Sequence, residues 1–366
     1  MMNNRELSTL NGFQHSAAIL QWLMLAVAVC FTPALAAQGS ADGRMDPGNY
    51  FRERADIRKY AVILTGPSVG EETTSRFRQW SFSLHDILIR DYGYSSDSIT
   101  LLMDRGSDSY PDNSRVDGAC DRQTIVTQLE ALAGQVKDGD QLTLFLIGHG
   151  TGSDEESKFN IVGPDITGEE FAALLDNFDQ QDLVIVNTTS ASYGFSTSLS
   201  SEGRVVISAT RSPAEKFDPI FSGYFIEALA QRNGDLDKNN RVSMLEAFNY
   251  ARQSVDAWYE EQGRLASEHA SLDDNGDALF TLDPNATEAD GRLAEIAYID
   301  VLTADDANLS PEALALKAQV QELEREVFLL RGRKADFLAD DYWAQMEQLL
   351  IDLARTTGQY HEYLEN

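Results

Sequence analysis

The sequence predicts a three-layer α/β fold with a mostly parallel central sheet, followed by a C-terminal helical hairpin. Runs of four to six consecutive apolar, partly β-branched residues end at turn formers, which is typical of strands buried on both faces. Segments with helical spacing of apolar residues alternate with these runs, as a parallel sheet requires. The expected strands are residues 59–66, 99–103, 142–147, 183–186 and 204–209.

The expected helices follow from the spacing of apolar side chains between these strands. Residues 71–90 place Phe77, Trp80 and Leu84 on one face, and residues 121–136 do the same with Ile125 and Leu129. Thr167 with Glu170 three residues later forms a capping-box pattern that opens the next helix, GEEFAALLDNF.

Composition divides the chain into an export signal, an α/β domain and a helical tail. The apolar run 17–31 and the small residues of Ala34-Leu35-Ala36 indicate a signal peptide, 1–36, and a periplasmic or secreted protein. The alternatives are a lipoprotein signal whose recognition box ends at Cys30 and a retained N-terminal membrane anchor. The expected segments are a linker 37–58, the α/β domain 59–285, a linker 286–310 and a hairpin 311–366.

Charge and cysteine content exclude several function classes. The formal net charge of −30 disfavours nucleic-acid and anionic membrane partners. No segment after the signal is long and apolar enough to span a bilayer. Once residues 1–36 are removed only Cys120 remains, so we expect no intramolecular disulfide and interpret this thiol as structural rather than nucleophilic.

The tail from Pro311 carries a heptad stripe. Gly332 interrupts the stripe, and a second amphipathic face follows it, which predicts two antiparallel helices joined near residues 331–334. The hairpin either packs on its own domain or mediates self-association through 311–366. The stripe consists of Leu316, Val320, Leu323, Val327 and Leu330.

An acidic loop between two helical patterns, residues 235–246, matches an EF-hand. Arg241 would offer only its carbonyl, and Asn240 stands where glycine is usual, a position that asparagine tolerates because it adopts the left-handed conformation. We expect a structural Ca²⁺ here, against the alternative of a capped acidic turn. A second acidic turn, 273–277, is interpreted as a solvated Asn-Gly turn. The expected ligands are Asp235, Asp237, Asn239, Arg241, Ser243 and Glu246.

Two of the expected strands end on polar residues. One ends on Gly148-His149-Gly150 and the other on the hydroxyl cluster that includes Ser190 and Ser192. Ligands bind at the carboxyl ends of strands in open α/β sheets. His149 can therefore act as a general base, the N–H of Gly150 can stabilise an oxyanion, and a hydroxyl can be a nucleophile for acyl transfer.

These motifs resemble the caspase-like cysteine peptidases, and among them the legumain (haemoglobinase) branch. The resemblance covers residues 59 to about 280 and includes TLLMD at 100–104, RVVISATRS at 204–212 and the acidic loop with SMLEAFNYA. It implies a caspase-like fold, peptide substrates and a catalytic His-Cys dyad. His149 and Gly150 match the family motif, and Ser190 stands at the nucleophile position.

A serine at that position changes the expected chemistry. A hydroxyl needs stronger base assistance and an orienting acid, which the legumain-type dyad does not require. Three interpretations follow: a pseudo-peptidase that binds extended peptides or acts as a scaffold, a hydrolase using Ser190 or Ser192 with His149 and an acid such as Asp154 or Asp165, and an α/β domain whose hydroxyls only cap a helix. Arg211 would contact an acidic substrate side chain or form a surface ion pair.

Overall fold

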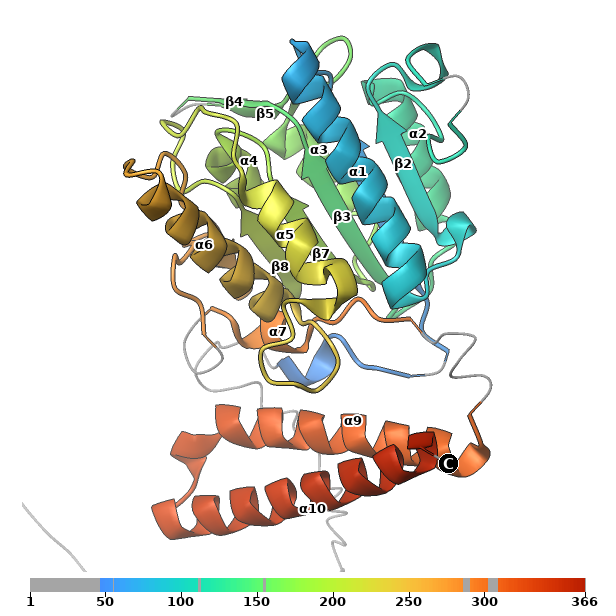
Figure 1. Cartoon of the computed structure of the whole chain (residues 1–366), viewed down its shortest axis with the longest axis vertical. Helices are drawn as coiled ribbons and strands as arrows, with labels where there is room; N and C mark the ends of the chain where they lie inside the picture. The colour runs from blue at the N-terminus through green and yellow to red at the C-terminus, as the bar shows by residue number, and fades with distance from the viewer. Residues whose placement is uncertain are drawn as a thin grey trace, which may run out of the picture. The chain divides into compact units, whose positions relative to one another are not determined.

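The centre of the fold is a six-stranded sheet with the strand order β2-β1-β3-β7-β8-β9 (Figure 1). Adjacent strands are parallel except for β8 and β9, which are antiparallel. In the central pair, Ile63 lies opposite Phe145, and every residue of both strands is buried. The strands are β1 (Lys59–Thr65), β2 (Ile99–Met103), β3 (Gln141–Ile147), β7 (Asp182–Asn187), β8 (Arg204–Ser208) and β9 (Ser271–Asp273).

The structure is a computed structural model, and it describes residues 47–54, 56–110, 113–153, 156–285, 290–301 and 309–365. All of them belong to the unit Asp42–Asn366. The expected signal peptide, 1–36, lies outside the described residues. So do Asp154 and parts of both expected linkers.

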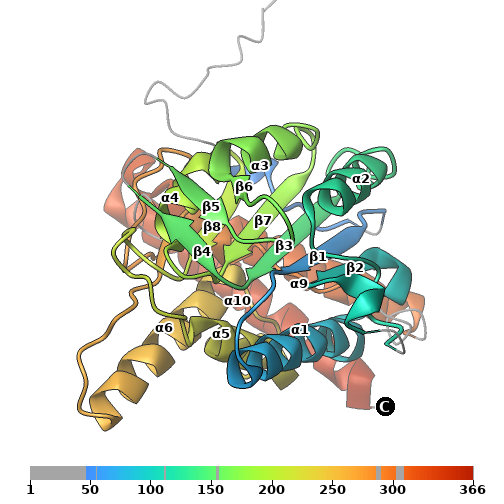
Figure 2. The ribbon, with the colours of Figure 1, turned by 90° about the horizontal axis from the view of Figure 1, so that it is seen from above.

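Helices cover both faces of the sheet, so the predicted three-layer α/β fold is confirmed. Seen from above, α1, α5 and α6 lie on one face and α2, α3 and α4 on the other (Figure 2). Apolar side chains form one core cluster under each set of helices. The helices are α1 (Glu71–Tyr92), α2 (Arg122–Ala133), α3 (Gly168–Leu175), α4 (Ser192–Leu199), α5 (Phe221–Leu229) and α6 (Met244–Glu261).

A second, three-stranded antiparallel sheet follows β3 directly. Its strands, in the order β4-β5-β6, are β4 (Gly150–Gly152), β5 (Ser157–Phe159) and β6 (Ile166–Thr167). The predicted capping box then opens α3, because the Thr167 side chain accepts a hydrogen bond from the backbone of Glu170 and the Glu170 carboxylate accepts one in return. The small sheet fixes the path of the chain immediately after His149.

Both segments expected as linkers contain packed residues. Residues 47–54 and 56–58, which we call the strap, bury the ring of Phe51 in the main core cluster. Residues 290–301 include α7 (Arg292–Ile296) and bury Leu293 and Ile299 completely. The folded core therefore extends beyond residue 285, because these segments cover apolar surface at the amino ends of the strands. Short 3-10 helices are Pro47–Asn49, Ser96–Ser98, Gly106–Asp108, Ala230–Arg232 and Lys334–Asp336.

The acidic turn 273–277 differs from the expected solvated turn. Asp273 belongs to β9, and both it and Asp274 are almost completely buried. The Asp274 carboxylate accepts hydrogen bonds from the N–H groups of Gly291 and Ala294, at 3.0 and 2.7 Å. Its role is thus to fasten the start of α7 to the sheet, a long-range contact that the local Asn-Gly pattern does not reveal.

The C-terminal tail forms the predicted helical hairpin. Its helices are α9 (Pro311–Gly332) and α10 (Ala339–Glu365), and Ser310 caps α9 by accepting the N–H of Ala313. Leu330, Tyr342 and Met346 form a small core between them. Among the described residues, no helix combines the length and apolarity that a membrane crossing requires.

Candidate functional site

The Gly148-His149-Gly150 turn presses the end of β3 against the chain that follows β7. Gly148 has a φ of 146°, a conformation that favours glycine. A Cβ on Gly150 would lie only 2.3 Å from the carbonyl oxygen of Ser190. The two glycines therefore allow a close approach that brings the predicted His149 and Ser190 segments together.

The Ser190 hydroxyl is bonded to the backbone of Gly150. The N–H of Gly150 donates to Ser190 Oγ at 3.2 Å, and Ser190 Oγ donates to the carbonyl of Gly150 at 3.3 Å. The Ser190 residue is only 3% exposed. No hydrogen bond joins the two described side chains of His149 and Ser190. The expected oxyanion donor, the Gly150 N–H, thus points at the hydroxyl itself.

His149 is oriented by Asp218, a residue in the loop after β8. Its Nδ1 lies 2.8 Å from Asp218 Oδ1, and the two side chains are 28% and 26% exposed. The ring of Phe77 packs edge-on against the imidazole with 5.2 Å between ring centroids. This arrangement fixes the ring and leaves Nε2 as the nitrogen that can exchange a proton with a ligand.

Asp218 carries the negative charge of this pair. The hydrogen bond with His149, opposed by burial and aided by the charges of His149 and Arg76, holds the pKa of Asp218 below its usual range. An Arg76 nitrogen lies 3.4 Å from the second Asp218 oxygen. The carboxylate is therefore ionised at neutral pH and available to stabilise a protonated imidazole.

Sequence reasoning missed Asp218. The acids expected to orient His149 were Asp154, which lies outside the described residues, and Asp165, whose carboxylate instead accepts the N–H of Ile161 at 3.2 Å. Asp218 follows the fifth expected strand in the sequence Phe-Asp-Pro, at the same sheet edge as His149. Its position after a strand was the one available signal, and many acidic residues of this chain share it.

Ser192 has a structural role. Its hydroxyl is buried and shares hydrogen bonds with Ser208 Oγ at 2.9 Å and Thr210 Oγ1 at 3.0 Å. The Tyr193 N–H donates to Thr210 Oγ1, so a residue after β8 satisfies the start of α4. The Ser192 hydroxyl ties α4 to β8 and is not directed to a ligand.

Arg211 joins a charged cluster beside the Ser190 turn. Its Nε lies 3.5 Å from Glu215 Oε1, which also lies 2.6 Å from His269 Nδ1. The Glu215 carbonyl accepts the N–H of Ala191 at 2.8 Å, which links the cluster to the residue after Ser190. Next to it lies a cavity of about 100 Å³, lined by Phe221, Arg252, Val255, Asp256, Glu268, His269, Ala270 and Leu282.

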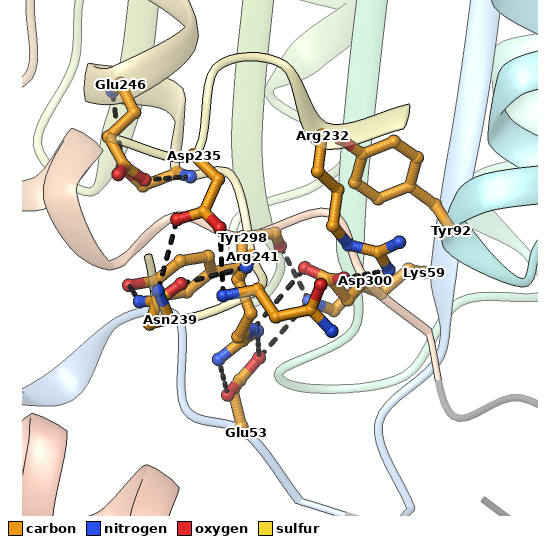
Figure 3. A network of polar contacts seen from close by, with 12 residues as sticks. Glu53, Lys59, Tyr92, Arg232, Asp235, Asn239, Arg241, Glu246, Tyr298 and Asp300 are labelled. Atoms are coloured by element: carbon orange, nitrogen blue, oxygen red, sulfur yellow. Dashed lines mark hydrogen bonds and ion pairs between the residues drawn. The ribbon is translucent and has the colours of Figure 1, made fainter. Parts of the chain in front are cut away.

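The acidic loop 235–246 brings three carboxylates together, and Figure 3 shows two of them, Asp235 and Glu246. Asp235, Asp237 and Glu246 each offer an oxygen within 4.8 Å of the others, so the loop contains a group that could hold a metal ion. Burial, with a further contribution from neighbouring carboxylates, raises the pKa of both Asp237 and Glu246. A bound cation would offset this mutual repulsion.

Two other predicted ligands, Asn239 and Ser243, already form hydrogen bonds within or beside the loop. Asn239 Oδ1 accepts the N–H of Arg241, while its amide nitrogen donates to Tyr298 Oη at 3.3 Å. Ser243 caps α6 in a capping box with Glu246. Asn240 has a φ of 65°, so this asparagine occupies the left-handed conformation expected at the usual glycine position.

The Arg241 side chain points away from the loop. It pairs with the Glu53 carboxylate, stacks over the Tyr298 ring at 3.7 Å and lies 3.5 Å from Asp300, while remaining only 12% exposed (Figure 3). Only its backbone carbonyl is left for the loop, as the sequence suggested. Cys120 is also buried, and burial raises the pKa of its thiol, which supports a structural role.

Comparisons with known proteins add a weak structural likeness. No family model matches the sequence, and no curated protein matches it. A crystal structure of protein GSU0716 from Geobacter sulfurreducens is similar to 59% of this chain and 92% of that chain, with 12% sequence identity and a TM-score of 0.39. Function must accordingly be inferred from the residues of this chain.

Proposed function

We propose that this chain is an exported, legumain-like peptidase homologue that binds extended peptides, or scaffolds a partner, without cleaving them. The observation that carries this proposal is the bonding of Ser190. Its hydroxyl exchanges hydrogen bonds with the backbone of Gly150 and none with His149. A serine without a hydrogen-bonded base is a poor nucleophile at neutral pH, whereas the family's thiol ionises readily.

The surroundings of Ser190 support a peptide ligand. His149 and Asp218 are partly exposed, and the cavity beside His269 has a volume close to that of a medium-sized side chain. Because Glu215 links His269 to the residue after Ser190, a peptide crossing His149 can place one side chain in this cavity. The lining carries both basic and acidic side chains, Arg252 and His269 together with Asp256 and Glu268, which favours a polar side chain in the cavity.

The binding proposal is tested with the purified chain lacking residues 1–36 and a random peptide display library. We expect selected peptides to bind the wild type and to lose at least about tenfold in affinity with His149→Ala. The control variant is His361→Ala on α10. Failure to select any peptide, or equal affinity for both variants, would contradict the proposed site.

Replacing Ser190 by Cys tests whether the site retains the geometry of its family. We expect Ser190→Cys to gain thiol-dependent cleavage of selected peptides, because the thiol can ionise beside His149. The double variant Ser190→Cys, His149→Ala should lack it. No cleavage by Ser190→Cys, even of a peptide that it binds, would argue against a legumain-like cleft.

The second candidate function is acyl transfer by a His149-Ser190 dyad. The His149–Asp218 pair favours it, because Asp218 supplies the orienting acid that a serine nucleophile needs. Ser190 Oγ would pass its proton to His149 Nε2 and attack the peptide carbonyl, and His149 would give that proton to the leaving amine as the C–N bond breaks. Water would then release the acyl group. The hydrogen bond that this step requires would have to form when the ligand binds.

We also propose that the acidic loop binds a structural Ca²⁺ through the oxygens of Asp235, Asp237, Asn239, Ser243 and Glu246 and the carbonyl of Arg241. Saturating Ca²⁺ should then raise the Tm by several degrees over the value in chelator, since a ligand at 100 times its Kd contributes about 2.7 kcal/mol. Glu246→Gln, which preserves the capping box, should abolish the shift, and Asp277→Asn in the other acidic turn should not. An equal Tm with Ca²⁺ and chelator would contradict the proposal.

A further inference from the structure

The strap, residues 47–54 and 56–58, is held from one side by α9. The Arg325 guanidinium donates hydrogen bonds to three strap carbonyls, those of Gly48 at 2.8 Å, Tyr50 at 3.0 Å and Phe51 at 3.3 Å. Hydrogen bonds from a charged donor are stronger than those between neutral groups. Because the acceptors are backbone carbonyls, this contact depends on the path of the strap and not on its side chains.

The other side of the strap is fastened to the amino ends of the strands. The Phe51 N–H donates to Asp182 Oδ2 at 2.7 Å, and the Arg58 N–H donates to Asp140 Oδ1 at 2.8 Å. The Tyr50 ring lies so close to Gly203 that a Cβ there would meet it at 2.2 Å. The strap is thus enclosed between the sheet edge and α9.

Glu53 joins the strap to a nearly buried arginine. It pairs with Arg241 and lies 3.7 Å from Lys59 Nζ (Figure 3). Burial opposes its ionisation, but the charges of Arg241 and Lys59 bring the pKa of Glu53 down to about 2. The strap therefore contacts the domain through the Glu53 side chain and α9 through its backbone carbonyls, which bond to Arg325.

Direct contacts also join α9 to the segment 290–301. Phe328 belongs to the main core cluster, with the Arg292 guanidinium 5.7 Å from its ring centroid, and Arg331 pairs with Glu295. These contacts lie in the last turns of α9. Further toward the start of the helix, at Arg325, its partner is the strap.

We propose that the strap is a clasp that holds the C-terminal hairpin on the α/β domain, so that loosening the strap releases the hairpin while the sheet remains folded. The geometry supports this because Arg325 bonds to strap carbonyls and the strap is in turn fixed by Asp182 and Arg241. The hairpin keeps its own small core when it is released. The clasp is independent of the peptide proposal, and it shares with the Ca²⁺ proposal only Arg241, whose guanidinium holds the strap while its carbonyl faces the acidic loop.

Hydrogen exchange measured by mass spectrometry on the chain lacking residues 1–36 tests the clasp. In Arg325→Met we expect amide exchange in α9 and α10 to accelerate at least about tenfold, because several charge-assisted hydrogen bonds are lost. Exchange in β1, β3 and β7 should stay unchanged. The control Arg333→Met removes an exposed arginine from the same hairpin and should have no effect.

A second variant tests the clasp by a substitution in the strap instead of in α9. Glu53→Gln leaves α9 intact but weakens the pairing of the strap with Arg241, so it should also accelerate exchange in α9 and α10 while the sheet stays protected. Unchanged hairpin exchange in both variants would overturn the clasp. Hairpin and sheet exchange that rise together in both variants would overturn it as well, since the hairpin would then not be released as a separate unit.

Discussion

Charged side chains differ in burial between the two ends of the strands of the central sheet, which we call the carboxyl edge and the amino edge. At the carboxyl ends of the strands, the hydrogen-bonded side chains of His149 and Asp218 remain partly accessible to solvent. At the amino ends, the charged groups of Lys59, Asp182 and Arg241 are nearly all buried. The pair at the carboxyl ends is the one that we propose contacts a ligand.

This difference in burial predicts which substitutions change the stability of the fold and which change ligand binding. Breaking one half of a buried ion pair leaves an uncompensated charge, which is costly, whereas an exposed pair contributes little to folding. We therefore expect substitutions at the amino edge to change mainly the free energy of unfolding. Substitutions at the carboxyl edge should change mainly ligand binding.

The largest expected effect is that of Arg241→Met. It removes a buried guanidinium and leaves the partly buried Glu53 without its main partner, so it should lower the free energy of unfolding by about 3 kcal/mol. Arg211→Met, at the half-exposed arginine of the carboxyl edge, should cost less than about 1 kcal/mol. Urea denaturation measures both. Equal losses would remove the proposed distinction between the edges.

Gly150→Ala is expected to show that the carboxyl end of β3 has no room for a larger residue. The new methyl group would meet the Ser190 carbonyl, so the free energy of unfolding should fall by about 1–3 kcal/mol. Gly134→Ala, at the C-cap of α2, is the matched control, because its nearest contact would be an ordinary 3.5 Å. A Gly150→Ala protein as stable as the control would contradict the close approach of the two strand ends.

Lowering the pH from 7.5 to 5.5 should raise the free energy of unfolding through buried carboxyl groups at the amino edge. Burial raises the pKa of Asp290 to about 7 and that of Asp274 to about 6, well above their values in the unfolded chain. The folded state therefore binds more protons as the pH falls through these values, and the free energy of unfolding should rise between pH 7.5 and 5.5, by on the order of 1–2 kcal/mol.

Asp290→Asn should make this pH profile flatter, because the asparagine does not titrate. At more acid pH the trend must reverse, since Glu53, where burial is outweighed by the charges of Arg241 and Lys59, and Glu170, which is hydrogen-bonded to Arg122, have pKa values of about 2 and then lose their charge. Thermal unfolding scanned across pH measures both limbs. A wild type that becomes steadily less stable from pH 7.5 to 5.5 would show that these carboxyl groups are not buried as described.

The smallest expected effect concerns the His149–Asp218 pair. A double-mutant cycle with His149→Ala and Asp218→Asn should give a coupling free energy below about 1 kcal/mol, because both side chains are partly solvated. The same variants should weaken peptide binding. A coupling of several kcal/mol would mean that the pair is a structural anchor like those of the amino edge.

The strands and most helices were predictable because their signal is local. The predicted strand 142–147 is observed as Gln141–Ile147, and the capping box of Thr167 and Glu170 opens α3 as expected. Apolar runs of this length have few alternatives to a buried parallel strand. The break of the helical tail after the heptad stripe was equally local, since α9 ends at Gly332.

The features that escaped prediction depend on contacts distant in sequence. Asp218 orients a histidine 69 residues before it, the difference between 218 and 149, and nothing in its neighbours marks it. The strap appears polar, yet Phe51 is buried and its N–H bonds to Asp182. Asp274 resembles part of an exposed turn, yet it fastens α7. A single sequence does not encode such pairings in any local pattern.

The central claim is that Ser190 does not act as a nucleophile. Intact-mass spectrometry after exposure of the purified chain lacking residues 1–36 to a fluorophosphonate probe tests it directly, with His149→Ala and Ser190→Ala as controls. We expect no adduct on the wild-type protein, because the Ser190 hydroxyl is bonded to Gly150 and not to His149. A stoichiometric adduct at Ser190 that disappears in His149→Ala would contradict it and establish the dyad as a working catalyst.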